Sequence, residues 1–262
     1  SAVIAALVQI TWASFSLRGT VHWRRAGAAA VGHARAVLKR FVPVVLGLGT
    51  LQINAMFGMM LVMWPVWVGA TMLGHPVTLD PASNSILSYT QAIYQFPMGV
   101  FALSVSTAVF PLLARTANVP EEYASVLRRG LRLSLFVSVP AMIGIILTRH
   151  DLVYVLLSGG KTGFSAEGVE RSAAVLMGYA PGMWAHSLNL MLTRAYYARQ
   201  DTRTPLRAAL VVMVLNLVLN LTLMWPLREA GFAWSTALCA MAQTSALLYF
   251  CRAKLGVLPF DR

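Results

Sequence analysis

The stretch Gln91–Arg115, QAIYQFPMGVFALSVSTAVFPLLAR, decides the class of fold. It carries no charge before its last residue and is almost entirely apolar, yet it contains Gln91, Gln95 and a proline, Pro97. An α-helix of about 20 apolar residues crosses the hydrocarbon core of a bilayer. The stretch therefore predicts a membrane-spanning helix with two amides and a helix breaker near one end.

The composition of the whole chain also indicates a membrane protein. Of its 262 residues, 58% are hydrophobic and 11% are charged, whereas a soluble domain carries about 25% charged residues. The net charge of +12 could indicate a nucleic-acid partner. We exclude that partner because the basic residues lie in short loops between apolar runs instead of on one face of a soluble scaffold.

The apolar residues group into segments that we interpret as helices, because lipid offers no hydrogen-bond partner to an unpaired backbone group. The predicted fold is all-α, a polytopic membrane helix bundle. We read the first segment as the end of a helix whose beginning is missing, so we expect the chain to be a fragment. The seven segments are 1–17, 41–73, 86–114, 131–148, 172–193, 208–227 and 230–250.

The basic residues set the expected orientation of the bundle. Most of the 21 Lys and Arg residues fall in alternate loops, at 18–40, 115–130, 194–207 and 251–262. Loops rich in Lys and Arg stay on the cytoplasmic side. We therefore expect these loops, and the C-terminus of the chain, in the cytoplasm. The loop 149–171 is then the longest on the outside, and its apolar part, LVYVLL, is too short to span.

The pattern of reactive residues argues against an enzyme. All nine acidic residues lie in loops or at predicted helix ends, and the sequence contains neither HExxH nor a glycine-rich phosphate loop. Cys239 and Cys251 lack metal-ligand spacing, so we expect no metal site. Transport or binding fits these observations better than catalysis.

Buried polar residues are the candidates for function, because polar side chains in membrane helices usually face a bundle interior or a watery cavity. Gln91 and Gln95 share a helix face. They either hydrogen-bond to another helix or line a substrate cavity, and Pro97 favours the cavity. Asn216 and Asn220 repeat the spacing, and there we favour packing over a cation site because no carboxylate is near in sequence.

Three further groups of polar residues are candidates. His186 and Asn189 lie three residues apart, and a structural role is favoured for the histidine. Arg132, about one turn inside its predicted helix, either extends to the headgroups or binds an anionic headgroup or pyrophosphate. In the loop 194–207, Asp201 or Thr202 would cap the next helix. We predict that this loop is a cytoplasmic lock or gate that includes Arg194, Arg199, Asp201 and Arg203.

Three motifs together resemble the MurJ/MviN family of the multidrug/oligosaccharidyl-lipid/polysaccharide exporter superfamily. They are QFPMGVFALSVSTAVFPLLAR (95–115), RRGLRLSLFVSVP (128–140) and AYYARQDTRTPLR (195–207). Members of the family have about fourteen helices in two lobes. The resemblance implies the end of helix six through helix twelve, with a helix end and basic inter-lobe linker at 1–40, the C-terminal lobe at 41–254, and a tail or linker at 255–262.

The resemblance also implies a function. The family moves lipid II, the undecaprenyl-pyrophosphate-linked peptidoglycan precursor, to the outer leaflet of the bacterial inner membrane by alternating access around a cationic cavity. The expected partners are this precursor, membrane lipids and an N-terminal lobe. One alternative is export of another lipid-linked saccharide or amphiphile. Another is a non-transporting scaffold that binds cell-wall synthesis enzymes.

Some family positions differ in this chain. Relatives commonly carry Asp-Arg just before the QFP motif, where this chain has Gln91 and Ala92, and on helix seven, where it has Gly58 and Met59. Some relatives bind sodium through that helix-seven aspartate and through residues that match Asn216, Asn220 and Thr236. The missing carboxylates argue against sodium here, and we expect no other cofactor.

Overall fold

The computed structural model describes residues 2–17, 38, 49, 52–72, 74–159 and 163–255, and the chain divides into two compact units, 1–42 and 43–262. The first unit contains helix α1, Ala2–Leu17, whose side chains from Leu7 to Ser16 are all exposed. Except for Leu38 and Leu255, the predicted linker 18–40 and the predicted tail 255–262 lie outside the described residues.

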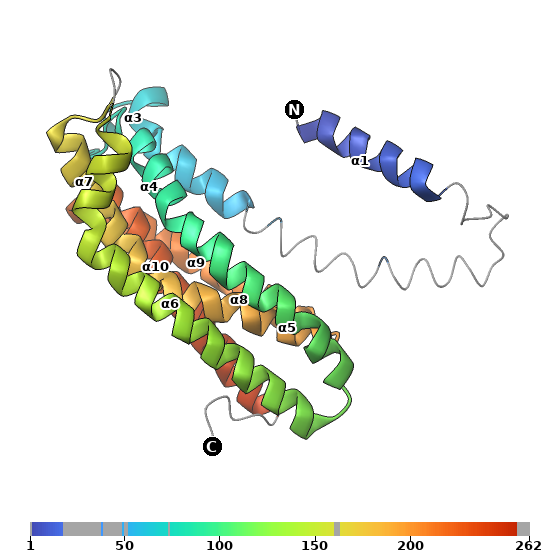
Figure 1. Cartoon of the computed structure of the whole chain (residues 1–262). Helices are drawn as coiled ribbons and strands as arrows, with labels where there is room; N and C mark the ends of the chain where they lie inside the picture. Colours follow the sequence, from blue (N-terminus) through green and yellow to red (C-terminus); the bar gives the residue numbers. More distant parts are fainter. Residues whose placement is uncertain are drawn as a thin grey trace. The chain divides into compact units, whose positions relative to one another are not determined.

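The second unit consists mainly of long helices that lie alongside one another (Figure 1). A helix over Gln52–Val62 comes first. The other elements are α3 (Trp64–Trp67), β1 (Thr71–Met72), β2 (His75–Pro76), α4 (Ser83–Pro97), η1 (Met98–Ala102), α5 (Leu103–Thr116), α6 (Pro120–Leu157), α7 (Ala166–Tyr179), η2 (Ala180–Gly182), α8 (Met183–Ala198), α9 (Arg203–Leu227) and α10 (Glu229–Leu255).

The quoted stretch lies in one continuous helical rod, α4–η1–α5. Pro97 has no N–H group, and its ring crowds the carbonyl one turn earlier. The chain continues as the π-helix η1, in which the N–H of Leu103 donates to the carbonyl of Met98. A π-helical turn inserts one extra residue and loosens the helix locally. A second proline, Pro111, lies inside α5.

Helix α6 is longer than the predicted segment 131–148. It contains 38 residues, or ~57 Å of helix at 1.5 Å per residue, about twice the hydrocarbon thickness of a bilayer. The apolar run LVYVLL, which we placed in a loop, forms the last turns of α6. Segments that contain charged residues therefore extend α6 at both ends. Arg132 lies about three turns after the start of α6, instead of about one turn after the start of the predicted helix.

Two other predicted segments are interrupted. The segment 41–73 ends in the antiparallel hairpin of β1 and β2, where Gly74 takes a φ of +82° and Trp64 donates its indole N–H to the carbonyl of Thr71. The segment 172–193 is split at η2, where Pro181 interrupts the helical hydrogen bonding between α7 and α8. Proline and glycine account for these breaks.

Three of the described helical stretches are long and apolar enough to cross a membrane, namely Ser83–Thr116, Pro120–Leu157 and Arg203–Leu227. Large apolar side chains on them point outward. Phe136 and Leu147 on α6 are 76% and 75% exposed, and Val211 on α9 is 69% exposed. Such exposure would be unfavourable in water and is suited to lipid.

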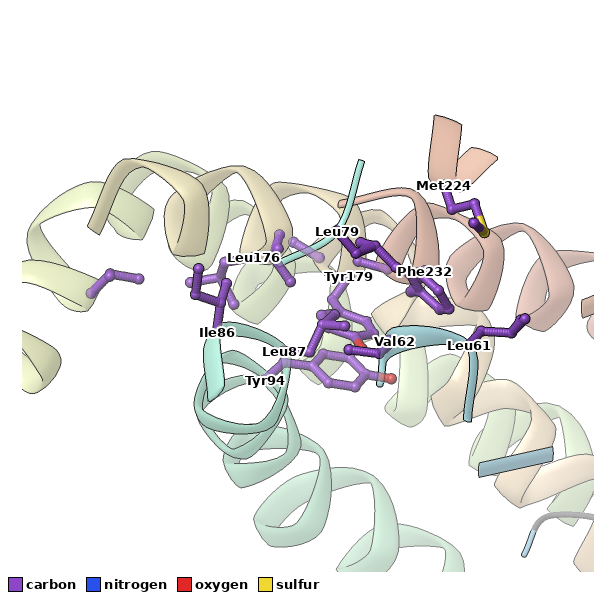
Figure 2. Packing of buried hydrophobic residues seen from close by; sticks show 14 of the residues in the cluster. Leu61, Val62, Leu79, Ile86, Leu87, Tyr94, Leu176, Tyr179, Met224 and Phe232 are labelled. Atoms are coloured by element: carbon purple, nitrogen blue, oxygen red, sulfur yellow. The ribbon is translucent and has the colours of Figure 1, made fainter. Parts of the chain in front are cut away.

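The core of the second unit forms two clusters of buried side chains. Figure 2 shows the first, in which residues of α4, α7 and α10 pack with the 52–62 helix. There the rings of Tyr94 and Tyr179 stack with centroids 4.9 Å apart. The second cluster joins α5, α6, α8 and α10. Because α10 contributes to both clusters, it connects the two halves of the bundle.

Small residues let α10 approach α7 and η2 closely. A Cβ added to Gly178 would lie 2.8 Å from Cβ of Ala233, and one added to Gly182 would lie 2.8 Å from Cα of Ala237. Both sides of the contact repeat a small residue every four positions. This pattern of small residues is characteristic of close helix pairs in membranes.

An ionic cluster joins the ends of α4, α7, α9 and α10. The guanidinium of Arg171 donates to both carboxylate oxygens of Asp80, at 2.8 and 3.1 Å, and to Glu229 at 2.5 Å. Arg228 donates to Asp80 at 3.0 Å and to the carbonyl of Thr78 at 3.0 Å. Glu229 is 3% exposed, and such a buried charge requires pairing of this kind.

The pKa of Asp80 gives one prediction. Burial alone would raise this pKa, but the hydrogen bonds from Arg171 and Ser83 and the charge of Arg171 outweigh burial and lower it. A lowered carboxyl pKa contributes stability at neutral pH that is lost as pH falls through it, below about pH 4. In detergent, Asp80→Asn should lower Tm at pH 7 and reduce the further fall in Tm upon acidification. An unchanged acid dependence would contradict this role.

The close helix contact gives a second prediction. Gly182→Ala should lower the stability of the purified protein by about 1–3 kcal/mol, because the new methyl group meets backbone atoms of Ala237 that have no room to move. Gly144→Ala on α6 is the matched control, since its added Cβ meets nothing within 4 Å. Equal Tm values for the two variants would show that the close approach at Gly182 does not determine the stability of the protein.

Candidate functional site

A cleft of about 590 Å³ lies between η1, α5, α8, α9 and α10. Its walls are mainly apolar, with Phe110 from α5, Leu190 from α8 and Leu206 from α9. Its volume falls in the usual range for small-molecule sites. The polar side chains on its wall are His186, Asn189, Thr193, Arg194, Tyr197 and Gln243.

The cleft brings together three of the residues singled out in the sequence, His186, Asn189 and Arg194. His186 packs edge-on against Tyr94, with ring centroids 6.0 Å apart. Asn189 donates to the carbonyl of Ala240 at 3.1 Å and accepts from the hydroxyl of Thr244 at 2.9 Å. The amide of Asn189 therefore connects α8 to α10, as polar side chains between membrane helices commonly do.

Arg194 is the basic side chain on the cleft wall. It is partly buried, and its guanidinium donates to the hydroxyl of Thr107 on α5 at 2.8 Å. The ion pairs found among the described residues involve His150, Arg171 and Arg228 and do not include Arg194. A cation is thus held in a mainly apolar cleft without a carboxylate partner from the described part of the chain.

The other predicted cavity residues lie outside this cleft. Gln91 and Gln95 are both exposed on α4, on a common face of the helix. Pro97 lines a separate cavity of about 10 Å³, beside the buried hydroxyl of Ser134, which has no hydrogen-bond partner among the described residues. Arg132 is exposed on α6. Their role as a cavity wall stays a prediction.

The predicted loop lock contains specific contacts. The Oδ1 atom of Asp201 accepts from the backbone N–H groups of Arg203 and Thr204, at 3.1 and 3.0 Å, so Asp201 caps the start of α9. The guanidinium of Arg199 lies 4.4 Å from the ring centroid of Tyr123 on α6, a cation–π arrangement. Arg203 is exposed. A gating role for this loop stays a prediction.

Two tyrosines extend the contacts near this loop into the bundle. Tyr123 on α6 donates its hydroxyl to the carbonyl of Ala195 on α8 at 2.8 Å. Tyr196 on α8 donates to the carbonyl of Leu247 on α10, also at 2.8 Å. The hydroxyls satisfy carbonyls across helix contacts and tie α6, α8 and α10 together where the loop begins.

The polar side chains of the predicted cation site form hydrogen bonds mainly within the protein. Asn220 donates to Oδ1 of Asn216 at 2.9 Å, and Asn216 donates to the hydroxyl of Ser235 at 3.0 Å. Thr236 donates to the carbonyl of Phe232 in its own helix. The buried Oδ1 of Asn220 has no hydrogen-bond partner among the described residues. One uncommitted amide oxygen without a carboxylate is a poor match for a cation, so these residues do not fit a sodium ion.

The sequence contains a signal for the cleft in the spacing of the residues of α8. His186, Leu190, Thr193, Arg194 and Tyr197 follow a helical spacing of three or four residues along one face of α8. Gln243 and Thr107 come from α10 and α5, and nothing near them in the sequence links them to this face. Only the packing of the three helices brings them to it.

Comparisons with known proteins identify the family. The family model described as lipid II flippase MurJ matches residues 2–261. The chain is 30% identical to the probable lipid II flippase MurJ of Vibrio cholerae, covering 79% of this chain and 37% of the relative. It is also 30% identical to that of Thermotoga maritima, covering 86% and 48%. The chain thus spans less than half the length of these curated relatives.

Solved structures share the fold. A lipid II flippase MurJ in an inward closed conformation matches with a TM-score of 0.70 at 24% identity, over 91% of this chain and 47% of that protein. An outward-facing MATE transporter of the MOP superfamily matches with a TM-score of 0.68 at 17% identity, over 85% and 46%.

These likenesses confirm the predicted all-α membrane bundle and the resemblance found in the three motifs. The apolar helices and the relatives together identify a multi-pass membrane protein. The chain belongs to the lipid II flippase MurJ family.

Proposed function

We propose that the protein containing this chain moves lipid II from the inner to the outer leaflet of the bacterial cytoplasmic membrane, and that this chain forms one lobe of the transporter. The observation that carries the proposal is the family match from residue 2 to residue 261. The fold supports it, because 91% of the chain aligns with 47% of a solved lipid II flippase MurJ. Transport, not catalysis, is the activity.

The packing of the lobe suits alternating access. The ionic cluster around Arg171 and the close contact of α7 with α10 hold the helices at one end together. The π-helix after Pro97 is a less regular element of the bundle, and π-helical turns occur often at functional sites. We infer that the lobe moves largely as one body and that deformation is concentrated at η1.

The proposal predicts rescue of a bacterium depleted of its own lipid II flippase. Expression of the protein that contains this chain should restore growth and the amount of lipid II in the outer leaflet. Failure to restore either, with the protein at normal levels in the membrane, would contradict the proposal. The other two functions, export of a different lipid-linked molecule or a scaffold for cell-wall enzymes, would then be favoured.

A second prediction concerns the exposed amides of α4. Gln91→Leu combined with Gln95→Leu should lower lipid II transport about tenfold, since two hydrogen bonds to a polar substrate together contribute about 1–2 kcal/mol. Expression and membrane insertion should not change. Thr222→Leu with Ser245→Leu, also exposed polar positions on helices, is the matched control. Transport equal to that of the control would show that the amides do not contact the substrate.

A further inference from the structure

A small cavity lies where the rod α4–η1–α5 is least regular. Its volume is about 10 Å³, and Pro97, Met98 and Ala102 form the part of its wall that belongs to the rod. Helices α6 and α8 form the opposite part of the wall, and each contributes hydroxyl groups. The serines that line the cavity are Ser134 and Ser138 on α6 and Ser187 on α8.

The hydroxyl of Ser134 is the group that requires an explanation. Ser134 is 2% exposed, and its hydroxyl has no hydrogen-bond partner among the described residues. Buried hydroxyls in native proteins are nearly always paired, either with protein atoms or with ordered water. A serine in a helix can donate to the carbonyl four residues earlier, as Ser138 does to the carbonyl of Ser134 at 2.7 Å. Ser134 makes no such bond, so its hydroxyl is available to the cavity that it lines.

The size and the chemistry of this cavity match one water molecule. A buried water occupies a space of about 10–15 Å³ on this measure and makes two to four hydrogen bonds. The hydroxyl of Ser134 can donate to it. The hydroxyl of Ser138 already donates to a carbonyl but can accept, and that of Ser187 can do either. The remaining wall is apolar, and a volume of about 10 Å³ excludes a larger polar ligand.

We propose that this cavity binds a single water molecule, which Ser134 holds beside the π-helix η1. Prolines are tolerated inside membrane helices where serine side chains and ordered waters satisfy the backbone groups that the proline leaves unpaired. Both are provided here, next to Pro97. A bound water reorients and exchanges partners, so it satisfies the serines of α6 and α8 in more than one shape of η1. This site is independent of which molecule the protein transports.

Hydroxyl-radical footprinting with X-rays tests for the water directly. Radiolysis of a bound water produces radicals that oxidise the side chains next to it. Met183 on α8 lines the cavity, whereas Met191 on the same helix does not, and both are buried from bulk solvent. In the purified whole protein that contains this chain, Met183 should therefore be oxidised several times faster than Met191.

Two variants assign the water to Ser134. Ser134→Ala removes the hydroxyl but keeps the backbone carbonyl to which Ser138 donates. It should lower the oxidation rate of Met183 roughly fivefold, the change in occupancy that the loss of one hydrogen bond produces. Ser106→Ala is the matched control, because Ser106 is a buried serine of α5 outside the cavity. The control should leave the rate of Met183 unchanged, and thermal unfolding of both variants identifies any misfolded protein.

Two outcomes of the footprinting would overturn the proposal. Oxidation of Met183 no faster than that of Met191 would show that the cavity is dry. Equal rates for Met183 in Ser134→Ala and Ser106→Ala would show that Ser134 does not hold the water.

A cryo-electron microscopy map of the unaltered protein provides a second measurement that needs no variant. We expect a density peak within about 3.2 Å of Oγ of Ser134, the usual limit for such a hydrogen bond. A map that shows other buried waters but no peak in this cavity would also contradict the proposal.

Discussion

The absence of water in the hydrocarbon core is the constraint on which the rest of this structure depends. A polar group there must find a partner inside the protein, and several polar side chains of this bundle do so across helix contacts. Tyr123, Tyr196 and Asn189 each bond to a backbone carbonyl of a neighbouring helix. These bonds and the close approach of α7 to α10 set which helices are neighbours. Arg194 on α8 likewise donates across a helix contact, to the hydroxyl of Thr107 on α5.

The same constraint distinguishes one end of the bundle, which ion pairs hold together, from a middle with less regular helix geometry. At that end, ion pairs join the charged side chains of Asp80, Arg171, Arg228 and Glu229. In the middle, Pro97 leaves a helical carbonyl without its usual donor, and η1 takes up the irregularity beside the cavity near Ser134. The proposed transport would use both properties, because a part that moves as one body would also have to reshape the face that meets the substrate.

The sequence was sufficient to predict the class of fold and the family, because length, apolar content and the three motifs are local properties. It could not predict that Arg171 and Arg228 meet Asp80, since these residues are 91 and 148 positions apart from it. The break at Pro181 was also missed, because the flanking residues are apolar enough to read as one segment. For the site, the helical spacing on α8 contains half of the residues that line the cleft. The partner residues from α5 and α10 could be placed only with the packed structure.

The most direct test of the account is reconstitution of the purified protein in liposomes with labelled lipid II on one leaflet. Labelled lipid II is expected to appear on the opposite leaflet faster than in protein-free liposomes. The movement of labelled phosphatidylglycerol is not expected to be accelerated to the same degree. Equal movement of both lipids, or no movement of lipid II above the protein-free rate, would contradict the central claim that this lobe belongs to a lipid II transporter.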